Sequence, residues 1–364
     1  MSTDRETTMR AAVMHGRRDI RIESVAVPRP RSGEVLVEVT AVGVCGTDAS
    51  EWSRGPKLFP INSPHAVTGH HGPMVLGHEF AGIVVGTGAG VSTEWLGKLV
   101  ASCGSIACGR CEMCQGGRSN TCRSYAAVGL HRDGALARYV STPVASCVDA
   151  GALGVGPVEA ALAQPMAIAV HAMRRSRVRE GDVAIVQGVG GVGAFLIHAL
   201  VDAGARVVAI DLDTSRLEVA RALGADVVIT GGTESARDEI ASEIVGRIPV
   251  FFEVTGSAPG LRLALDVVPM GTSIVLLGIQ KGLSEIDLAT ITVREIELIG
   301  TNAMVRETDF PDAVRLVSLR AGGWGDVVSR SLPLDDLVEG ALRPMAEGRP
   351  PAIKTLISPH SNHD

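Results

Sequence analysis

Four cysteines lie close together in one Gly-rich stretch of the chain. Cys108, Cys111 and Cys114 follow one another at three-residue steps, and Cys122 comes eight residues later. Four thiolates at this spacing can surround one tetrahedral zinc ion and leave no coordination position for water. Two disulfides are the alternative, but they need an oxidising compartment that no feature of the sequence indicates. The pattern therefore predicts a structural zinc site.

A second and less closed cluster lies upstream. The segment Cys45-Gly-Thr47-Asp is followed by Gly-His78-Glu79. A thiolate, a neutral imidazole and a carboxylate supply two or three protein ligands, so a zinc ion held by them keeps a position for water or substrate. Alone, the three residue types can equally be ordinary core or surface residues. The prediction of a catalytic zinc therefore depends on the rest of the chain.

A glycine-rich turn follows an apolar run at 183–187, and an apolar stretch, 194–200, continues from it as a predicted helix. Glycines at such a turn let the backbone approach a pyrophosphate, which binds the free N–H groups of the helix N-terminus. The turn comprises Gly188, Val189, Gly190, Gly191, Val192 and Gly193.

Asp211 ends the next predicted strand, Arg206–Asp211, 18 residues after Gly193. An acid at this distance hydrogen-bonds the 2′-hydroxyl of the adenosine ribose and repels a 2′-phosphate, which predicts NAD rather than NADP. The alternative is a solvated acid at a strand end. Arg216, in the helical stretch that follows, is a further candidate cofactor-binding residue.

Composition limits the kind of protein. The chain has 364 residues, which fits two domains, and its 46% hydrophobic and 20% charged residues are typical of a globular enzyme. A net charge of −6 and 3% aromatic residues give no reason to expect nucleic acid or a membrane as partner.

The location is predicted to be cytoplasmic. The first eight residues are polar and contain no apolar core, so we expect no secretory signal there. The uncharged stretch 183–201 is long enough to suggest a membrane span, but its four glycines fit a buried strand and helix better. Cys103 and Cys147 are then most simply buried thiols.

Two patterns of secondary structure divide the chain. Short β-type runs at 9–14, 20–27 and 34–42 indicate a β-rich first part, with Cys45 just beyond the third run. From about Pro165, strand-like runs alternate with helical stretches, which predicts a parallel sheet with right-handed crossovers. After about residue 310 we expect one more helical segment and then a run at 352–357 that returns to the first part.

These residues together resemble the zinc-containing medium-chain alcohol dehydrogenases over nearly the whole length. The segment 63–69 ahead of Gly77-His78-Glu79-Phe80 is most similar to the butanediol and sorbitol dehydrogenases. The resemblance implies an α/β fold: a β-rich GroES-like catalytic domain at 1–164, a doubly wound Rossmann NAD-binding domain at 165–303, and a segment at 304–364 that returns to the catalytic domain. It also implies a homodimer or homotetramer.

The resemblance assigns roles to individual residues. Cys45 and His78 are implied as ligands of the catalytic zinc, and Glu79 as a neighbouring acid or an alternating ligand. Thr47 is implied to supply the hydroxyl that takes the proton of the substrate. Two zinc ions and NAD are the implied cofactors.

Two positions depart from the family pattern. Gln164 stands where the polyol branch usually has a glutamate at the metal, so it is either a neutral residue at the zinc or a packing residue at the domain boundary. Ser50 stands where many relatives have a proton-relaying histidine, so the proton must leave through Thr47, water or a cofactor ribose.

The leading hypothesis is NAD-dependent oxidation of a secondary alcohol, a diol or polyol, with reverse ketone reduction. The alternatives are a related dehydrogenase of amino-alcohol or aldehyde substrates, a zinc-free reductase of activated alkenes, and an NAD-binding zinc sensor on the same fold.

Overall fold

The computed structural model describes residues 7–280, 282–328 and 331–360. Most of the N-terminal segment in which we expect no secretory signal, residues 1–6, therefore lies outside the described residues. The chain forms two compact units, one of residues 1–164 with 305–364 and the other of residues 165–304. Among the described residues, no helix is both long and apolar enough to cross a membrane.

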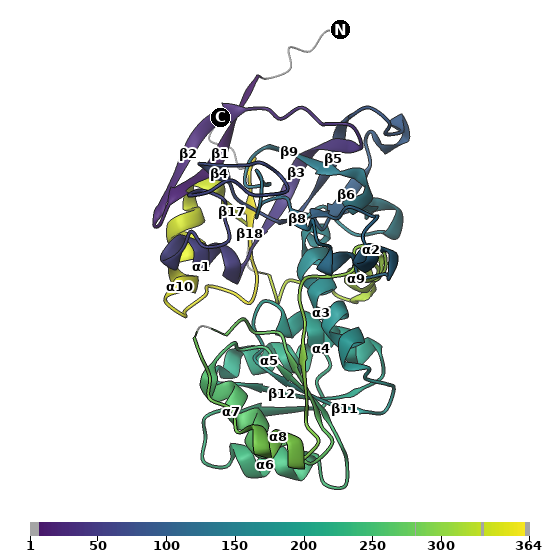
Figure 1. Cartoon of the computed structure of the whole chain (residues 1–364), viewed down its shortest axis with the longest axis vertical. Coiled ribbons are helices and arrows are strands. Elements are labelled where there is room, and N and C mark those ends of the chain that lie inside the picture. Colours follow the sequence, from purple (N-terminus) through teal and green to yellow (C-terminus); the bar gives the residue numbers. More distant parts are fainter. Residues whose placement is uncertain (1–6, 281, 329–330, 361–364) are drawn as a thin grey trace. The chain divides into compact units, whose positions relative to one another are not determined.

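The first unit is built around the long strand β3 (Glu34–Val44), most of whose residues are buried. Strand β3 pairs antiparallel with β5, β9 and β18, and β18 comes from the far end of the sequence, as its yellow colour beside the purple β3 shows in Figure 1. The C-terminal segment thus adds strands to the sheet that contains β3. The other strands are β1 (Thr8–Gly16), β2 (Asp19–Ala26), β4 (Met74–Val75), β5 (Glu79–Thr87), β6 (Leu99–Ser102), β7 (Ser105–Ile106), β8 (Ala126–Ala127), β9 (Tyr139–Pro143), β10 (Cys147–Asp149), β17 (Leu332–Pro333) and β18 (Thr355–Ser358).

Short helices complete this unit, and the tail contains more of them than the single segment that we predict from the sequence. After α9 (Asp309–Leu319), a π-helical turn at Leu337–Leu342 leads into α10 (Arg343–Ala346). Helical turns of four to six residues are shorter than the window in which an apolar period can be recognised, so the sequence pattern missed them. The remaining helices are α1 (Gly46–Arg54) and α2 (Glu112–Gln115), and α3 (Ala163–Ser176) runs across the boundary into the second unit.

The second unit is a parallel sheet with the strand order β13-β12-β11-β14-β15-β16. This order reverses between β11 and β14, as in doubly wound dinucleotide-binding sheets, and it confirms the predicted fold class. Buried strands such as β11 explain the uncharged stretch, because helices cover parallel sheets on both faces. The strands are β11 (Val183–Gln187), β12 (Arg206–Asp211), β13 (Val227–Thr230), β14 (Val250–Glu253), β15 (Ser273–Leu276) and β16 (Glu297–Gly300); the helices are α4 (Gly193–Asp202), α5 (Thr214–Ala222), α6 (Ala236–Glu243), α7 (Ala258–Val267) and α8 (Leu288–Val293).

Candidate functional site

Cys45 lies at the junction of strand β3 and helix α1. It is the N-cap of α1, where its side chain accepts from the backbone of Asp48 and its own backbone N–H donates to the Asp48 carboxylate at 2.9 Å. This reciprocal cap fixes the thiol at the end of a rigid, buried strand.

The strand pairing brings the other two predicted ligands to the same place. In the register of β3 with β5, Gly43 is opposite Glu79, so His78 lies beside the end of β3. One ligand atom each of Cys45, His78 and Glu79 lies within 4.8 Å of the others. A thiolate, an imidazole and a carboxylate at this separation fit a zinc ion with an open position.

Asp48 is a fully buried acid beside this cluster that the sequence pattern did not single out for a role. Its Oδ1 lies 3.6 Å from His78 Nδ1, and within the described residues neither atom has a hydrogen-bond partner. Burial lowers the pKa of His78, but the Asp48 carboxylate and the Cys45 thiol outweigh it and hold that pKa well above its usual value. A carboxylate at one ring nitrogen orients a histidine whose other nitrogen binds a metal.

Lys354 is a second residue that the sequence did not reveal. Its side chain is 3% exposed, its Nζ contacts the Glu79 carboxylate, and it donates to the Val44 carbonyl at 3.2 Å. The position is set by β18, in which Thr355 pairs with Val44. The only signal for Lys354 in the sequence was a charged residue within the mostly apolar run at 352–357.

The remaining predicted residues of this site have separate positions. Thr47 is the second residue of α1 and is half-buried. The Ser50 hydroxyl accepts a hydrogen bond from Arg54 at 2.8 Å. Gln164 is the half-buried second residue of α3 and the last residue of the first unit before the chain enters the second unit. Of the described contacts, none links Gln164 to Cys45.

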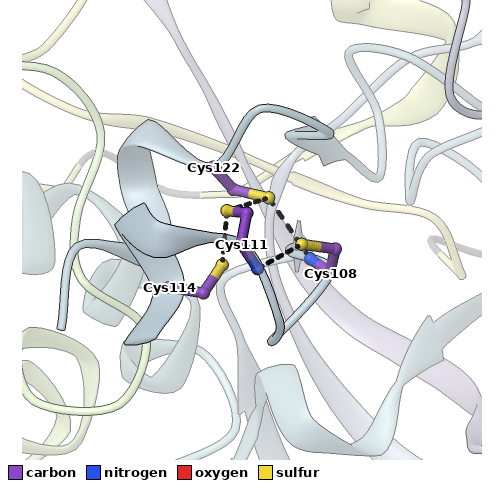
Figure 2. Close-up of side chains that lie close together, drawn as sticks. All are labelled: Cys108, Cys111, Cys114 and Cys122. Atoms are coloured by element: carbon purple, nitrogen blue, oxygen red, sulfur yellow. Dashed lines mark hydrogen bonds between the residues drawn. The ribbon is translucent and has the colours of Figure 1, made fainter. Parts of the chain in front are cut away.

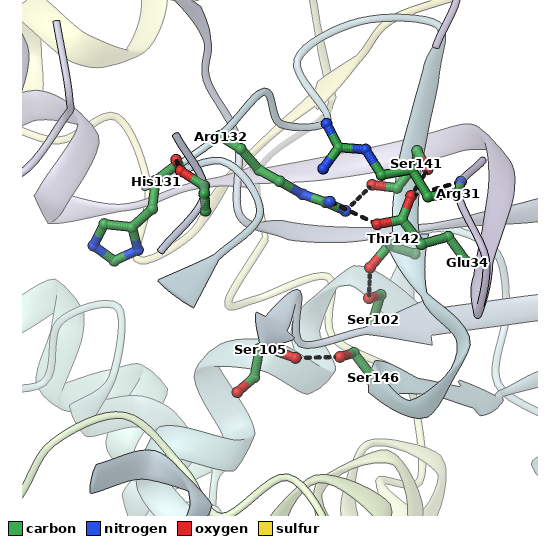
Figure 3. Close-up of polar contacts among 10 residues, drawn as sticks. Arg31, Glu34, Ser102, Ser105, His131, Arg132, Ser141, Thr142 and Ser146 are labelled. Atoms are coloured by element: carbon green, nitrogen blue, oxygen red, sulfur yellow. Dashed lines mark hydrogen bonds and ion pairs between the residues drawn. The ribbon is translucent and has the colours of Figure 1, made fainter. Parts of the chain in front are cut away.

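A loop with an unexpected histidine packs against the ligand-bearing segment. A side chain at Gly129 would meet the Gly77 carbonyl at 2.1 Å, so the two backbones are in close contact. Arg132, in the same loop, binds the buried Glu34 carboxylate at 2.6 Å (Figure 3). His131 precedes it, is 8% exposed and packs against the His65 ring, with ring centroids 4.5 Å apart and the rings tilted by 32°.

The four cysteines Cys108, Cys111, Cys114 and Cys122 form a separate cluster, drawn in Figure 2. All four are free thiols, and the Cys111 sulfur lies 3.6 Å from that of Cys114 and 3.9 Å from that of Cys122. Sulfur atoms 2.3 Å from one tetrahedral zinc are about 3.8 Å apart, so this spacing fits a zinc ion and is too long for a disulfide.

Backbone amides prepare this loop for anionic sulfur. N–H groups of Cys114 and Arg123 lower the pKa of Cys111 to about 6, and those of Arg110 and Cys111 lower the pKa of Cys108. Burial and the neighbouring thiols raise the pKa of Cys114 to about 12. Four thiolates together need a cation, which a zinc ion would supply.

The glycine turn connects β11 to α4. Gly188 has a φ of +103°, which favours glycine, and a side chain at Gly193 would meet the Gly188 carbonyl at 1.8 Å. By contrast, no atom of the described residues lies within 4 Å of a side chain built at Gly190, so the backbone is open there. Gly191 and Val192 complete the turn before α4 begins. Close helix–strand packing with one open glycine matches a pyrophosphate turn.

Asp211 ends β12 beside this turn. Its carboxylate accepts from the Val189 N–H at 2.7 Å and from the Asp213 N–H at 3.0 Å. Arg216 of α5 lies 3.7 Å from the same carboxylate. Asp211 thus links the end of β12 to the glycine turn through these hydrogen bonds.

Two protein-family models match the chain. The alcohol dehydrogenase GroES-like domain matches residues 31–152, and the zinc-binding dehydrogenase domain matches residues 191–318.

Known relatives match over most of their length. (R,R)-butanediol dehydrogenase of Bacillus subtilis is 32% identical over 97% of this chain and 100% of its own. Sorbitol dehydrogenase of the same organism is 32% identical over 80% of this chain and 81% of its own. L-threonine 3-dehydrogenase of Rhizobium johnstonii is 30% identical over 88% of this chain and 90% of its own.

Solved structures of dehydrogenases also superpose on this chain. The 2R,3R-butanediol dehydrogenase of Bacillus subtilis superposes with a TM-score of 0.86 at 30% identity, covering 97% of this chain and 100% of that one. A dehydrogenase of Sinorhizobium meliloti 1021, named as zinc-binding and bound to NADP, superposes with a TM-score of 0.81 at 27% identity. The match covers 97% of this chain and 100% of that one. The chain therefore belongs to the zinc-containing medium-chain dehydrogenase family, in the branch of the butanediol and sorbitol dehydrogenases.

Proposed function

We propose that the protein is a zinc-dependent oxidoreductase that transfers a hydride between NAD and a secondary alcohol, with a diol or polyol as the substrate, and that it also reduces the corresponding ketone. The gathering of Cys45, His78 and Glu79 at the end of β3 carries this proposal. The similarity to butanediol and sorbitol dehydrogenases supports the substrate class.

Each side chain has a role in this reaction. Cys45 and His78 hold the catalytic zinc, and Asp48 orients the imidazole. When bound, zinc would supply a Lewis acid for the alcohol oxygen, and the nicotinamide cofactor would supply the hydride acceptor. Thr47 accepts the proton of the alcohol through its hydroxyl. Glu79 stays near the metal as an acid whose charge Lys354 balances.

The proton then needs a route that does not use a histidine at position 50. Ser50 accepts a hydrogen bond from the Arg54 guanidinium, which cannot take up a proton. We therefore assign the exit from Thr47 to water or to a hydroxyl of the cofactor ribose.

The cofactor in this proposal is NAD. Asp211 carries a negative charge beside the glycine turn, where a 2′-phosphate would be repelled. Arg216 is close enough to pair with Asp211 and to reduce that repulsion, and a relative of known structure binds NADP. Kinetics with both cofactors therefore decide between them.

A second zinc ion bound by Cys108, Cys111, Cys114 and Cys122 stabilises the loop, so we expect two zinc ions per chain. Metal analysis of the purified protein separates the alternatives. Two zinc ions favour a dehydrogenase, one favours a sensor, and none favours a zinc-free reductase.

The decisive experiment is a substrate panel with NAD, monitored by NADH absorbance. It contains diols, polyols, simple secondary alcohols and L-threonine, because the similarity to L-threonine 3-dehydrogenases makes an amino alcohol the second candidate. Turnover of a diol or polyol well above the others supports the proposal, and turnover confined to L-threonine would replace it.

We also propose a homodimer or homotetramer. Strand β16 is the last strand of its sheet in the described residues, and an open edge offers backbone groups for pairing with a second copy. Light scattering coupled to gel filtration measures the mass directly.

A further inference from the structure

Glu253 is a fully buried acid at the carboxyl end of β14 that the proposed reaction does not use. Its Oε1 accepts from the backbone N–H groups of Thr255 at 2.8 Å and Gly256 at 3.1 Å, and the Thr255 hydroxyl also contacts it. Its Oε2 accepts from the Gly256 N–H at 3.2 Å and from Gln280 Nε2 at 3.1 Å. Backbone and amide N–H groups only donate, so in each of these contacts a carboxylate oxygen of Glu253 is the acceptor.

In the part of the chain that the structure describes, the charge of Glu253 is not balanced by a basic side chain. Within residues 7–280, 282–328 and 331–360, no lysine or arginine forms an ion pair with it. A buried carboxylate held only by neutral donors leaves a negative potential around it, which favours a cationic group nearby.

The position of Glu253 in the sheet relates it to the cofactor. Its neighbour in the register of β11 with β14 is Gln187, which is 8% exposed and whose Oε1 has no hydrogen-bond partner among the described residues. The strand order reverses between these two strands, and dinucleotides bind at that point. The glycine turn and Asp211 belong to the adenosine half of the sheet, so Glu253 lies at the start of the nicotinamide half.

Glu253 also holds together the loops that surround this position. A side chain at Gly188, in the glycine turn, would lie 3.1 Å from Thr255. A side chain at Gly278 would meet the backbone nitrogen of Gly256 at 2.0 Å. The loops after β11, β14 and β15 are thus in contact, and the Glu253 carboxylate binds two of them directly.

We infer that Glu253 is a positioning residue for the nicotinamide half of the cofactor and that its charge favours the oxidised cofactor over the reduced one. The inference rests on the proposed function, because it requires a nicotinamide cofactor. The oxidised ring carries a positive charge that the reduced ring lacks, so a fixed negative charge stabilises only the oxidised form. A neutral residue at this position would remove that difference.

The test compares dissociation constants for NAD+ and NADH, measured by calorimetry or protein fluorescence on the purified holoenzyme. Glu253→Gln should raise the ratio of the NAD+ constant to the NADH constant by about fivefold. Glu253→Asp is the matched control: it keeps the charge but shortens the reach to the loops, so both constants should rise together. An unchanged ratio in Glu253→Gln would overturn the inference.

A second variant keeps the test decisive if Glu253→Gln does not fold. Gln280→Lys leaves the carboxylate in place and puts an ammonium group next to it, so the ratio should change in the same direction; a constant ratio there overturns the inference. If the wild-type protein binds NADP(H) instead, the same ratio is measured with that pair. A wild-type protein that binds neither cofactor refutes the proposed function and the inference with it. If the wild type binds cofactor but the variants have the same ratio of dissociation constants as the wild type, the inference alone is refuted.

Discussion

The ammonium group of Lys354 and the carboxylate of Glu79 form a buried ion pair, although the two residues lie far apart in the sequence. The pair is set by the sheet, because β18 and β5 flank the same strand β3. The negative charge of Glu79 is therefore already partly balanced before any metal binds next to it.

Breaking this pair from one side should destabilise the protein strongly. Lys354→Met leaves a buried carboxylate without a partner, and we expect the free energy of unfolding in urea to fall by about 3–5 kcal/mol. The double variant Lys354→Met/Glu79→Gln should be more stable than the sum of the two single effects predicts.

An exposed pair provides the control. Lys98 and Asp149 are 3.1 Å apart with side chains 40% and 26% exposed, so Lys98→Met should change stability by about 1 kcal/mol or less. Similar losses for Lys98→Met and Lys354→Met would show that burial of the Glu79 pair has no energetic effect.

The two zinc sites should respond differently to the loss of one thiol. Cys111→Ser should lower the folding yield, because a closed four-thiolate site contributes folding free energy. Cys45→Ser should leave a folded, NAD-binding protein with almost no turnover. Zinc content, circular dichroism and NADH formation measure the three properties, with Cys147→Ala as a variant outside both clusters. Active and folded Cys45→Ser and Cys111→Ser variants would contradict both assignments.

Cofactor choice should depend on Asp211. Asp211→Ser removes the charge that repels a 2′-phosphate, so the ratio of kcat/KM with NAD to kcat/KM with NADP should fall by at least about tenfold. Asp213→Ser is the matched control, because Asp213 is an exposed acid that caps α5 through Ser215. A wild-type enzyme that uses both cofactors equally well would disprove the role of Asp211.

Acid should destabilise the protein through His131. Burial, with the nearby His65 and His78, lowers the pKa of His131 to about 4, and its Nδ1 already accepts a hydrogen bond from Ala127. The unfolded chain binds a proton near pH 6.5, so it holds more protons than the folded chain between about pH 6.5 and 4. The free energy of unfolding should therefore fall by about 2 kcal/mol as the pH is lowered through this range.

His131→Phe tests this dependence, because phenylalanine keeps a ring against His65 but cannot be protonated. Urea unfolding at several pH values should show a smaller loss for the variant than for the wild type. Parallel curves for the two proteins would place the acid sensitivity elsewhere.

A substitution at Gln164 should show whether its side chain lies at the catalytic zinc or packs at the domain boundary. If it lies at the catalytic zinc, Gln164→Glu adds a negative ligand and should slow zinc loss to a chelator. It should also shift the alkaline limb of the activity profile upward, because an added negative charge disfavours deprotonation at the metal. Unchanged zinc loss and an unchanged pH profile would leave Gln164 as a packing residue of α3.

Much of this protein can be predicted from its sequence, because the relevant patterns are local. Alternating strand and helix patterns after Pro165 depend on neighbouring residues, and they led to the doubly wound fold that the structure confirms. The cysteines at 108–122 and the glycines at 188–193 each lie within a single loop, where spacing alone restricts the geometry. The family assignment follows from the same motifs and is confirmed by the comparisons.

The tertiary structure alone decided which distant side chains meet. Asp48 beside His78, Lys354 on Glu79 and Gln280 on Glu253 join residues from different strands or loops, and no periodicity links such positions. Their charges matter because they are buried, and burial depends on the register of the sheets and on the packing of the whole unit. For this reason the sequence predicts the ligands of the candidate metal sites, whereas the charges that orient and balance them become visible only in the folded chain.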